Sequence, residues 1–332
     1  MSDFGRLERV DLRQGWMTEA QHFTPWLARE ENLALLADTL GLDLEFEAQE
    51  RAVGPFRADI LCKNTADDSW VLIENQLERT DHSHLGQLIT YAAGLHAVTI
   101  VWIAARFADE HRAACDWLNE ITSENVRIFA LEVELWRIGQ SPIAPKFNII
   151  SQPNDWAKQV ATAQKAINDG EFSDTRQTQW RYWKSVEDLI GKANGAIRPV
   201  SPQASSWVSH GIGKTGVHFN FAMSRPEKLV RIEVYLSGLH AKSDFAQLAA
   251  RQAEIEAKLG KSLVWQPMPD KKDARIALHL SDIDPFNEAD WDRQHRWIVE
   301  NAQLLHQVFR PLVMSLNRGG KIAEDPASSE AL

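Results

Sequence analysis

The sequence predicts a two-domain α/β protein, with a mixed sheet flanked by helices in its first half and a separate α+β domain in its second half. Its 332 residues suffice for two domains of ordinary size, each with its own core. Helix and strand patterns alternate along residues 1–150, whereas residues 151–318 place several short strands between long helical patterns. The last residues, 319–332, are small and polar and are predicted to be disordered.

The first half begins with a helix signal over residues 24–41. Thr24 is the expected N-cap, Pro25 occupies the first turn and Gly41 ends the helix. The following patterns predict helices and strands in alternation: strands over residues 42–52, 58–63, 70–76, 98–105 and 126–136, and helices over residues 81–94 and 108–122. A stretch that contains several prolines, residues 141–155, is predicted to be the linker between the domains.

The second half begins with a helical region over residues 156–192. Its other predicted elements are strands over residues 206–210, 216–223, 229–236, 263–266 and 274–280, and helices over residues 242–259 and 288–316. The GIGKTG stretch from Gly211 to Gly216 is similar to a phosphate-binding loop. Val208 stands where that motif needs a glycine, so we predict a hairpin turn.

Aromatic and basic residues share the start of this second half. They are Trp180, Tyr182, Trp183 and Trp207, with Arg176, Arg181 and Lys184. Such a set forms either a surface that stacks on bases or a buried helix contact, and the buried contact is the favoured interpretation.

Composition excludes several classes of protein. Hydrophobic residues make up 44% and charged residues 25%, which excludes a disordered chain, and two cysteines exclude a disulfide scaffold. No apolar run is long enough to span a membrane, and the first residues lack the apolar core of a signal peptide. We therefore expect a cytoplasmic protein with no membrane partner, in which Cys62 and Cys115 are reduced.

The net charge of -10 belongs to the first half. Residues 1–150 hold 13 Lys+Arg and 24 Asp+Glu, a balance of -11, and residues 151–332 hold 23 and 22, a balance of +1. An acidic excess of this kind is either a solvated surface or includes carboxylates that surround a metal ion.

A predicted hairpin brings two carboxylates together. If the strands at 58–63 and 70–76 pair around a turn at Ala66-Asp67, Asp59 lies opposite Glu74, and Gln76 shares the face of Glu74. Directly opposed like charges destabilise a sheet, so a compensating cation is expected. Mg²⁺ is the natural candidate, because it prefers one or two carboxylates together with waters and a substrate phosphate.

The helix after the hairpin adds polar groups. Thr80 or Asp81 can cap it, which places its positive end near the carboxylates. Gln87 and Tyr91 are four residues apart and share one face, and His84 lies one turn before Gln87.

This order of residues resembles the PD-(D/E)XK superfamily of restriction-endonuclease-like and RecB-like nucleases. The matching elements are an acidic residue in an early helix (Glu30 or Glu31), Asp59 on one strand, Glu74-Asn75-Gln76 on the next strand, and Gln87-Leu88-Ile89-Thr90-Tyr91 on the following helix. The chain also resembles bacterial proteins of unknown function in which such a domain precedes a C-terminal domain of unknown function. The resemblance implies a restriction-endonuclease-like fold for residues 1–150 and a recognition or assembly role for the domain at 151–318.

The resemblance further implies a nuclease that uses Mg²⁺ or Mn²⁺ and acts on DNA, in defence against foreign DNA or in DNA repair. Asp59, Glu74 and the Asn75 carbonyl would hold the ion, with Glu30 or Glu31 as a further ligand, and Gln87 and Tyr91 would position the DNA or the waters of the ion. Many nucleases of this superfamily cut as dimers, so a homodimer is a further option that nothing in the sequence decides.

One position departs from the family pattern. The family lysine that acts on the attacking water is Gln76 here, and an amide carries no charge and is a poor base. The missing charge would then come from another residue, with Arg57, Lys63, Arg79 and His84 as candidates. The alternative is a catalytically altered nuclease fold that serves as a nucleic-acid or protein interaction module.

Overall fold

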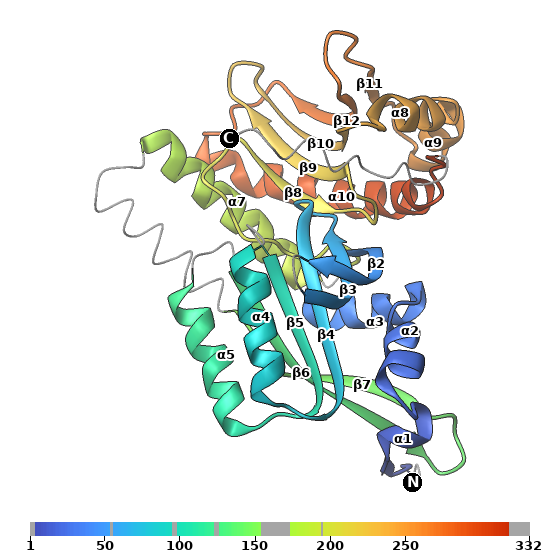
Figure 1. The fold of residues 1–332 in the computed structure, drawn as a ribbon. Helices are drawn as coiled ribbons and strands as arrows, with labels where there is room; N and C mark the ends of the chain where they lie inside the picture. The colour runs from blue at the N-terminus through green and yellow to red at the C-terminus, as the bar shows by residue number, and fades with distance from the viewer. Residues whose placement is uncertain are drawn as a thin grey trace.

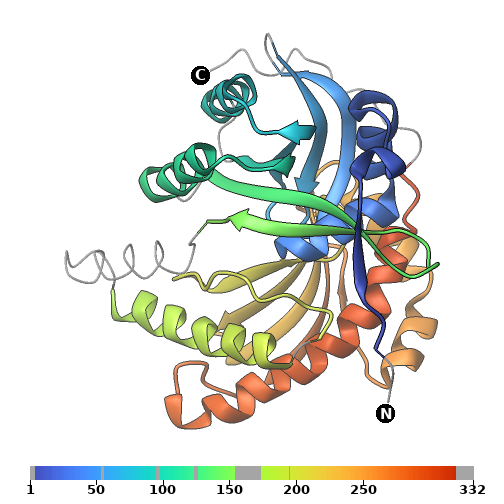
Figure 2. The same ribbon diagram turned by 90° about the horizontal axis from the view of Figure 1, so that it is seen from below.

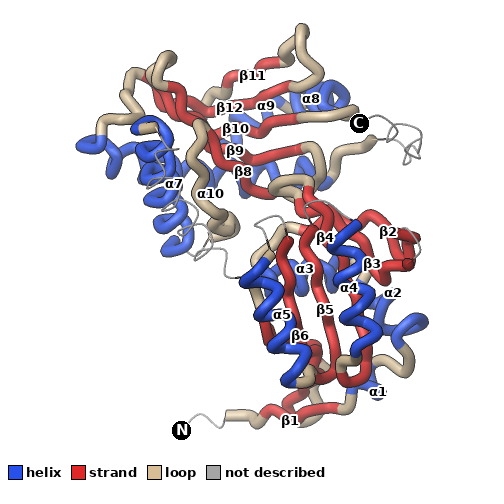
Figure 3. The backbone as a smooth tube through the Cα atoms, turned by 60° about the vertical axis from the view of Figure 1, so that its left-hand side comes forward, coloured by secondary structure: helices blue, strands red, loops and turns tan. Residues whose placement is uncertain are grey.

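The computed structural model describes residues 4–53, 56–94, 98–122, 126–153, 173–193 and 195–318. Two sheets follow one another along the chain, one of seven strands and one of five, each with helices packed against it (Figures 1 and 3). The predicted fold class, a mixed α/β part followed by an α+β part, is confirmed. Within the described residues, no helix combines the length and the apolar composition that a membrane crossing requires.

The N-terminal sheet has the order β1-β6-β5-β4-β3-β2, with β7 also paired to β6. Its central strands β4, β5 and β6 are parallel to one another, and the remaining pairs are antiparallel. The strands are β1 (Leu7–Val10), β2 (Leu44–Val53), β3 (Phe56–Asn64), β4 (Ser69–Arg79), β5 (Val98–Arg106), β6 (Val126–Ile138) and β7 (Ala144–Ser151). The central strands are apolar over most of their length because helices cover both of their faces.

The two faces of this sheet carry different helices. One face packs on α1 (Leu12–Gly15), the π-helix η1 (Glu19–Phe23), α2 (Thr24–Leu27) and α3 (Glu30–Leu40). The other face packs on α4 (His82–Gly94) and α5 (Asp109–Ile121), which lie side by side in Figures 1 and 3. Two separate apolar clusters therefore hold the sheet between its layers of helices.

The C-terminal sheet is antiparallel and has the order β11-β12-β10-β9-β8. Its strands are β8 (Trp207–Gly211), β9 (Val217–Ser224), β10 (Leu229–Leu236), β11 (Val264–Gln266) and β12 (Ala274–Ser281). Its helices are α7 (Asp174–Ala193), α8 (Ala241–Ala249), α9 (Gln252–Leu259), the short 3-10 helix η2 (Glu288–Asp290) and α10 (Trp291–Met314). They bury one face of the sheet in a single apolar cluster; Figure 2 shows α7 and α10 beside that sheet.

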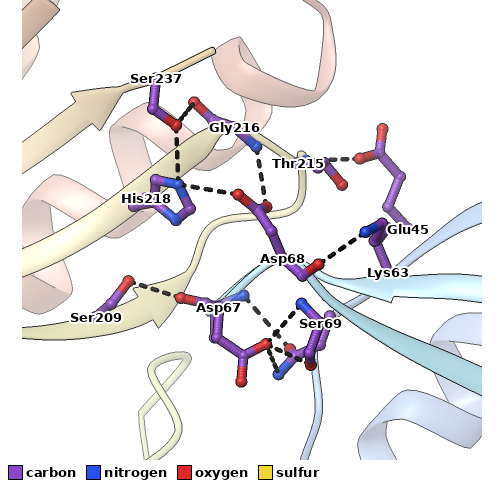
Figure 4. Close-up of polar contacts among 12 residues, drawn as sticks. Glu45, Lys63, Asp67, Asp68, Ser69, Ser209, Thr215, Gly216, His218 and Ser237 are labelled. Atoms are coloured by element: carbon purple, nitrogen blue, oxygen red, sulfur yellow. Dashed lines mark hydrogen bonds and ion pairs between the residues drawn. The ribbon is translucent and has the colours of Figure 1, made fainter. Parts of the chain in front are cut away.

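The turns of two hairpins join the sheets (Figure 4). Ser209 Oγ donates to the carbonyl of Ala66 at 2.7 Å, and the amide of Gly216 donates to Asp68 Oδ1 at 3.1 Å. Further from the turns, Arg310 on α10 donates to both carboxylate oxygens of Asp43, at 2.7 and 3.1 Å. The GIGKTG stretch is the β8–β9 turn, as predicted, and it serves this contact.

Several predicted boundaries are corrected. The helix expected over residues 24–41 is interrupted at Ala28 and Arg29, and Thr24 is a buried helical residue rather than an N-cap. Gly41 does end α3, with a left-handed φ of 71°. The middle of the predicted linker forms β7, because alternating side chains of this segment can add a strand to β6.

In the second half, the structure again confirms some predictions and corrects others. The helix predicted over residues 242–259 is two helices, α8 and α9, separated at Ala250 and Arg251. Tyr182 and Trp183 are buried in the core, as the favoured interpretation expected, whereas Trp207 is 47% exposed. Most of the helical region predicted from residue 156 and the whole tail at 319–332 lie outside the described residues.

Candidate active site

The pairing of β3 with β4 has the predicted register. Leu61 lies opposite Leu72, and Ile60 lies opposite Ile73. The next residue on each strand is Asp59 and Glu74, so the hairpin brings the two carboxylates to neighbouring positions near the centre of the sheet. The two groups interact, because the charge of Asp59 raises the pKa of Glu74.

Asp59 is held by the strand beside it. Asn75 donates to Asp59 Oδ2 from its backbone amide, at 2.9 Å, and from its side-chain amide. Thr24 Oγ1 in turn lies 3.0 Å from Asn75 Oδ1 and donates to it, which fixes the orientation of the Asn75 amide. Thr24 and Asn75 are both 3% exposed, so this relay from α2 to the carboxylate is inside the protein.

Glu74 is buried, at 3% exposed, and it receives a hydrogen bond from the hydroxyl of Tyr91 on α4. Its Oε1 has no hydrogen-bond partner among the described residues. Burial and the charge of Asp59 raise the pKa of Glu74 to about 8. Burial also raises the pKa of Asp59 and outweighs the two hydrogen bonds from Asn75, which lower it.

A third carboxylate comes from η1. Glu19 Oε2 accepts a hydrogen bond from the amide of Leu77 at 2.5 Å, and its charge acts on Asp59. Glu30 and Glu31 lie instead in the exposed first turn of α3. Nothing in the sequence pattern marked Glu19, because a five-residue π-helix gives no periodic signal.

Gln76 is 2% exposed and its side-chain amide is fully engaged. Its Oε1 accepts from Trp102 Nε1 at 2.9 Å, and its Nε2 donates to the carbonyl of Arg79 at 2.9 Å and to Asp81 Oδ2 at 3.3 Å. The amide therefore ties β4 to β5 and to the start of α4.

The candidates for the missing positive charge have different positions. His84 Nδ1 lies 2.8 Å from Asp81 Oδ2, and the charge of His84 lowers the pKa of Asp59, so His84 is beside the site. Arg79 is 64% exposed and pairs with Glu110 at 3.8 Å. Lys63 donates to the carbonyl of Asp68 near the hairpin turn, about 13 Å along β3 from Asp59. The side chain of Arg57 lies outside the described residues.

Gln87 and Tyr91 lie one turn apart on α4, as the helical spacing predicted. Tyr91 is 2% exposed and reaches Glu74, whereas Gln87 is only partly buried. The DNA-positioning role expected for both residues stays a prediction.

The donor set fits a hard divalent cation. Glu74 is buried, its pKa is raised, and its Oε1 has no partner among the described residues; such a group beside a second carboxylate holds either a proton or a cation, and a cation removes the repulsion between the two. Among the residues that the structure describes, no group of three or more His, Cys, Asp or Glu side chains is arranged to hold a metal. An ion here would thus have few protein ligands, which is the usual state of Mg²⁺.

Known structures show limited similarity to this chain. A repair endonuclease from Pyrococcus abyssi is 16% identical, with a TM-score of 0.23 over 31% of this chain and 48% of that one. A complex of EndoMS with double-stranded DNA is 18% identical, with a TM-score of 0.24 over 32% and 45% of the two chains. SfsA from Pyrococcus furiosus, in complex with Ca²⁺, is 18% identical, with a TM-score of 0.23 over 38% and 59%.

The matched part of this chain spans about half the length of each of these structures. No curated protein matches the chain. Its C-terminal part, residues 178–313, matches the model of a domain of unknown function, DUF4268.

Proposed function

We propose that this protein is a metal-dependent DNA phosphodiesterase that uses Mg²⁺ or Mn²⁺. One observation carries the proposal: Glu74 is buried beside the partly buried Asp59, whose charge raises its pKa, and Glu74 Oε1 has no partner among the described residues. A folded protein keeps such a costly arrangement where a ligand compensates for it.

Asp59 and Glu74 would hold the ion, with the backbone carbonyl of Asn75 as a third ligand. The bound ion would lower the pKa of an attacking water and stabilise the leaving phosphate oxygen. Thr24 and Asn75 keep Asp59 in place, and Tyr91 keeps Glu74 in place, so both carboxylates are oriented before substrate arrives.

His84 is the group that best replaces the family lysine. Asp81 orients its ring through Nδ1, which leaves Nε2 as the nitrogen available to a phosphate or a water. Gln76 cannot take this role without breaking its bonds to Trp102 and Arg79. We therefore assign Gln76 to positioning β4 and His84 to contact with substrate.

The test is cleavage of plasmid and of labelled single- and double-stranded DNA with Mg²⁺, with Mn²⁺ and with EDTA. Asp59→Asn and Glu74→Gln each replace a carboxyl group by an amide with little change of shape, and Glu120→Gln, at an exposed carboxylate on α5, is the matched control. A thermal-shift titration with Mg²⁺ gives a readout that does not need activity. We expect Mg²⁺ to raise the melting temperature of the wild type and of Glu120→Gln only.

The buried state of Gln76 favours a second candidate, an interaction module that keeps the fold without catalysis. The two candidates differ in the outcome of the same experiment. DNA binding without cleavage under all metal conditions would support the module, whereas cleavage lost in Asp59→Asn would support the phosphodiesterase. The role in defence or in repair, the cytoplasmic location and the possible homodimer remain proposals.

A further inference from the structure

A second candidate site lies between the two sheets. A cavity of about 990 Å³ is lined by residues from the end of α3, the β3–β4 turn, the segment before β8 and the C-terminal sheet. This volume is at the upper end of what small-molecule and cofactor sites occupy. The cavity contains none of Asp59, Glu74 or His84.

The face of the C-terminal sheet opposite its apolar cluster forms one wall of the cavity. The strand register places its mostly polar residues in rows: Ser209, Asn220 and Glu233 in one row, Trp207, Ala222 and Arg231 in the next, and His218, Tyr235 and Arg275 in a third. The alternate residues, such as Val208, Phe221 and Ile232, point into the core on the opposite face. A cavity wall made of arginine, asparagine and aromatic side chains is suited to a polar, planar ligand.

Two arginines meet at one buried carboxylate of this wall. Arg231 and Arg275 both pair with Glu233 Oε2, at 2.6 and 2.9 Å, and Arg231 also lies 3.6 Å from the exposed carboxylate of Glu227. The other cavity arginines are each matched by an aspartate: Arg198 by Asp38, Arg310 by Asp43 and Arg127 by Asp67. Among the lining residues, Arg231 and Arg275 therefore have one carboxylate between them, and Glu227 reaches Arg231 from outside the cavity; an anion would be held where the two guanidinium groups meet.

Two further groups on this wall suit a base. Trp207 is 47% exposed at the β8 edge, which leaves its ring open for stacking. Asn220 lies in the neighbouring row; it is 7% exposed, and its Oδ1 has no hydrogen-bond partner among the described residues. Its Nδ2 donates to Glu233 Oε1 at 3.5 Å through one N–H, so the second N–H and the Oδ1 acceptor would meet the edge of a nucleobase.

We propose that the cavity between the two sheets binds a nucleotide, with its phosphate at Arg231 and Arg275 and its base at Trp207 and Asn220. The chemistry is shared by a free nucleotide and by a nucleotide turned out of a DNA strand, and a cavity of this size admits either. The inference does not depend on the phosphodiesterase, because none of the proposed metal ligands contributes to the cavity.

The test is binding in the presence of EDTA, which excludes metal-dependent cleavage. Fluorescence anisotropy would measure a short labelled duplex with one unpaired nucleotide and a fully paired duplex of the same length. The four deoxynucleoside monophosphates would serve as competitors and, by calorimetry, as direct ligands.

Two variants have matched controls. Trp207→Ala is compared with Trp117→Ala, an exposed tryptophan on α5 that is 57% exposed and outside the cavity. Arg231→Gln is compared with Arg293→Gln on α10, also outside the cavity. Arg231→Gln should fold, because Arg275 still compensates Glu233, and circular dichroism checks this.

We expect Trp207→Ala and Arg231→Gln each to weaken binding by about tenfold or more, while both controls bind as the wild type does. Binding of the monophosphates with this mutational pattern identifies a free nucleotide as the ligand. Preferential binding of the duplex with the unpaired nucleotide identifies the DNA-borne form. The proposal is overturned if no probe binds at millimolar concentration, or if the two cavity variants bind as tightly as their controls.

Discussion

Replacing Glu74 by glutamine should stabilise the metal-free protein. Burial and the neighbouring charge of Asp59 raise the pKa of Glu74 from 4.5 to about 8. Between these values the folded protein keeps a proton that the unfolded chain releases, so the contribution of Glu74 to stability is complete below pH 4.5 and is lost as the pH rises through 8. Glutamine resembles the protonated form at every pH and does not lose this contribution.

The size of the effect follows from the shift. A pH of 7 is about 2.5 units above the pKa of Glu74 in the unfolded chain, which corresponds to roughly 3 kcal/mol of stability lost by the wild type between pH 4.5 and pH 7. Chemical denaturation in EDTA at several pH values between 5 and 8 measures the free energy of unfolding of wild type, Glu74→Gln and the control Glu120→Gln.

The stability advantage of Glu74→Gln over wild type should grow as the pH rises, whereas Glu120→Gln should follow the wild type. Saturating Mg²⁺ should remove much of the advantage by stabilising the wild type alone. Parallel pH profiles of wild type and Glu74→Gln would refute the claim that this carboxylate carries an electrostatic cost.

Three further predictions concern stability elsewhere in the molecule. Burial lowers the pKa of His295 and of His306 to about 4, so each neutral histidine contributes on the order of 3 kcal/mol of stability above pH 6.5, and this contribution is lost as the pH falls through 4. His306→Gln should therefore make the free energy of unfolding less dependent on pH on the acid side. An unchanged acid side of the profile would contradict this. Arg310→Leu should cost about 1–2 kcal/mol by removing both hydrogen bonds to Asp43, and a double-mutant cycle with Asp43→Leu should show a coupling clearly above zero. Trp102→Phe leaves the buried Gln76 Oε1 without its donor and should cost about 1–3 kcal/mol in calorimetry, so an unchanged transition temperature would argue against the Gln76 bond.

The central hairpin could be predicted from the sequence because its turn fixes its register. Once Ala66-Asp67 is taken as the turn, every opposed pair follows, and a slip of one residue would expose the apolar side chains. The same local logic located Gly41 as the end of α3 and placed Tyr91 on the helix that reaches Glu74.

Contacts between distant segments could not be read in this way. Glu19 reaches the amide of Leu77 from a short π-helix 58 residues earlier in the chain, and Trp102 engages Gln76 across a parallel strand pair. The sequence did not predict β7, because the prolines in and around it and its polar residues are typical of a linker, whereas pairing with β6 outweighs this local preference. The cavity wall could not be predicted from the sequence either, since Arg231 and Arg275 meet at Glu233 only when β10 and β12 pair.

The most direct test of the proposed active site is the rate of DNA cleavage by Asp59→Asn in saturating Mg²⁺ or Mn²⁺. The wild type and Glu120→Gln should cleave DNA with the metal and not with EDTA, and Asp59→Asn should cleave it about a hundredfold more slowly or worse. Cleavage by Asp59→Asn at the wild-type rate would contradict the assignment of the Asp59–Glu74 pair as the metal centre.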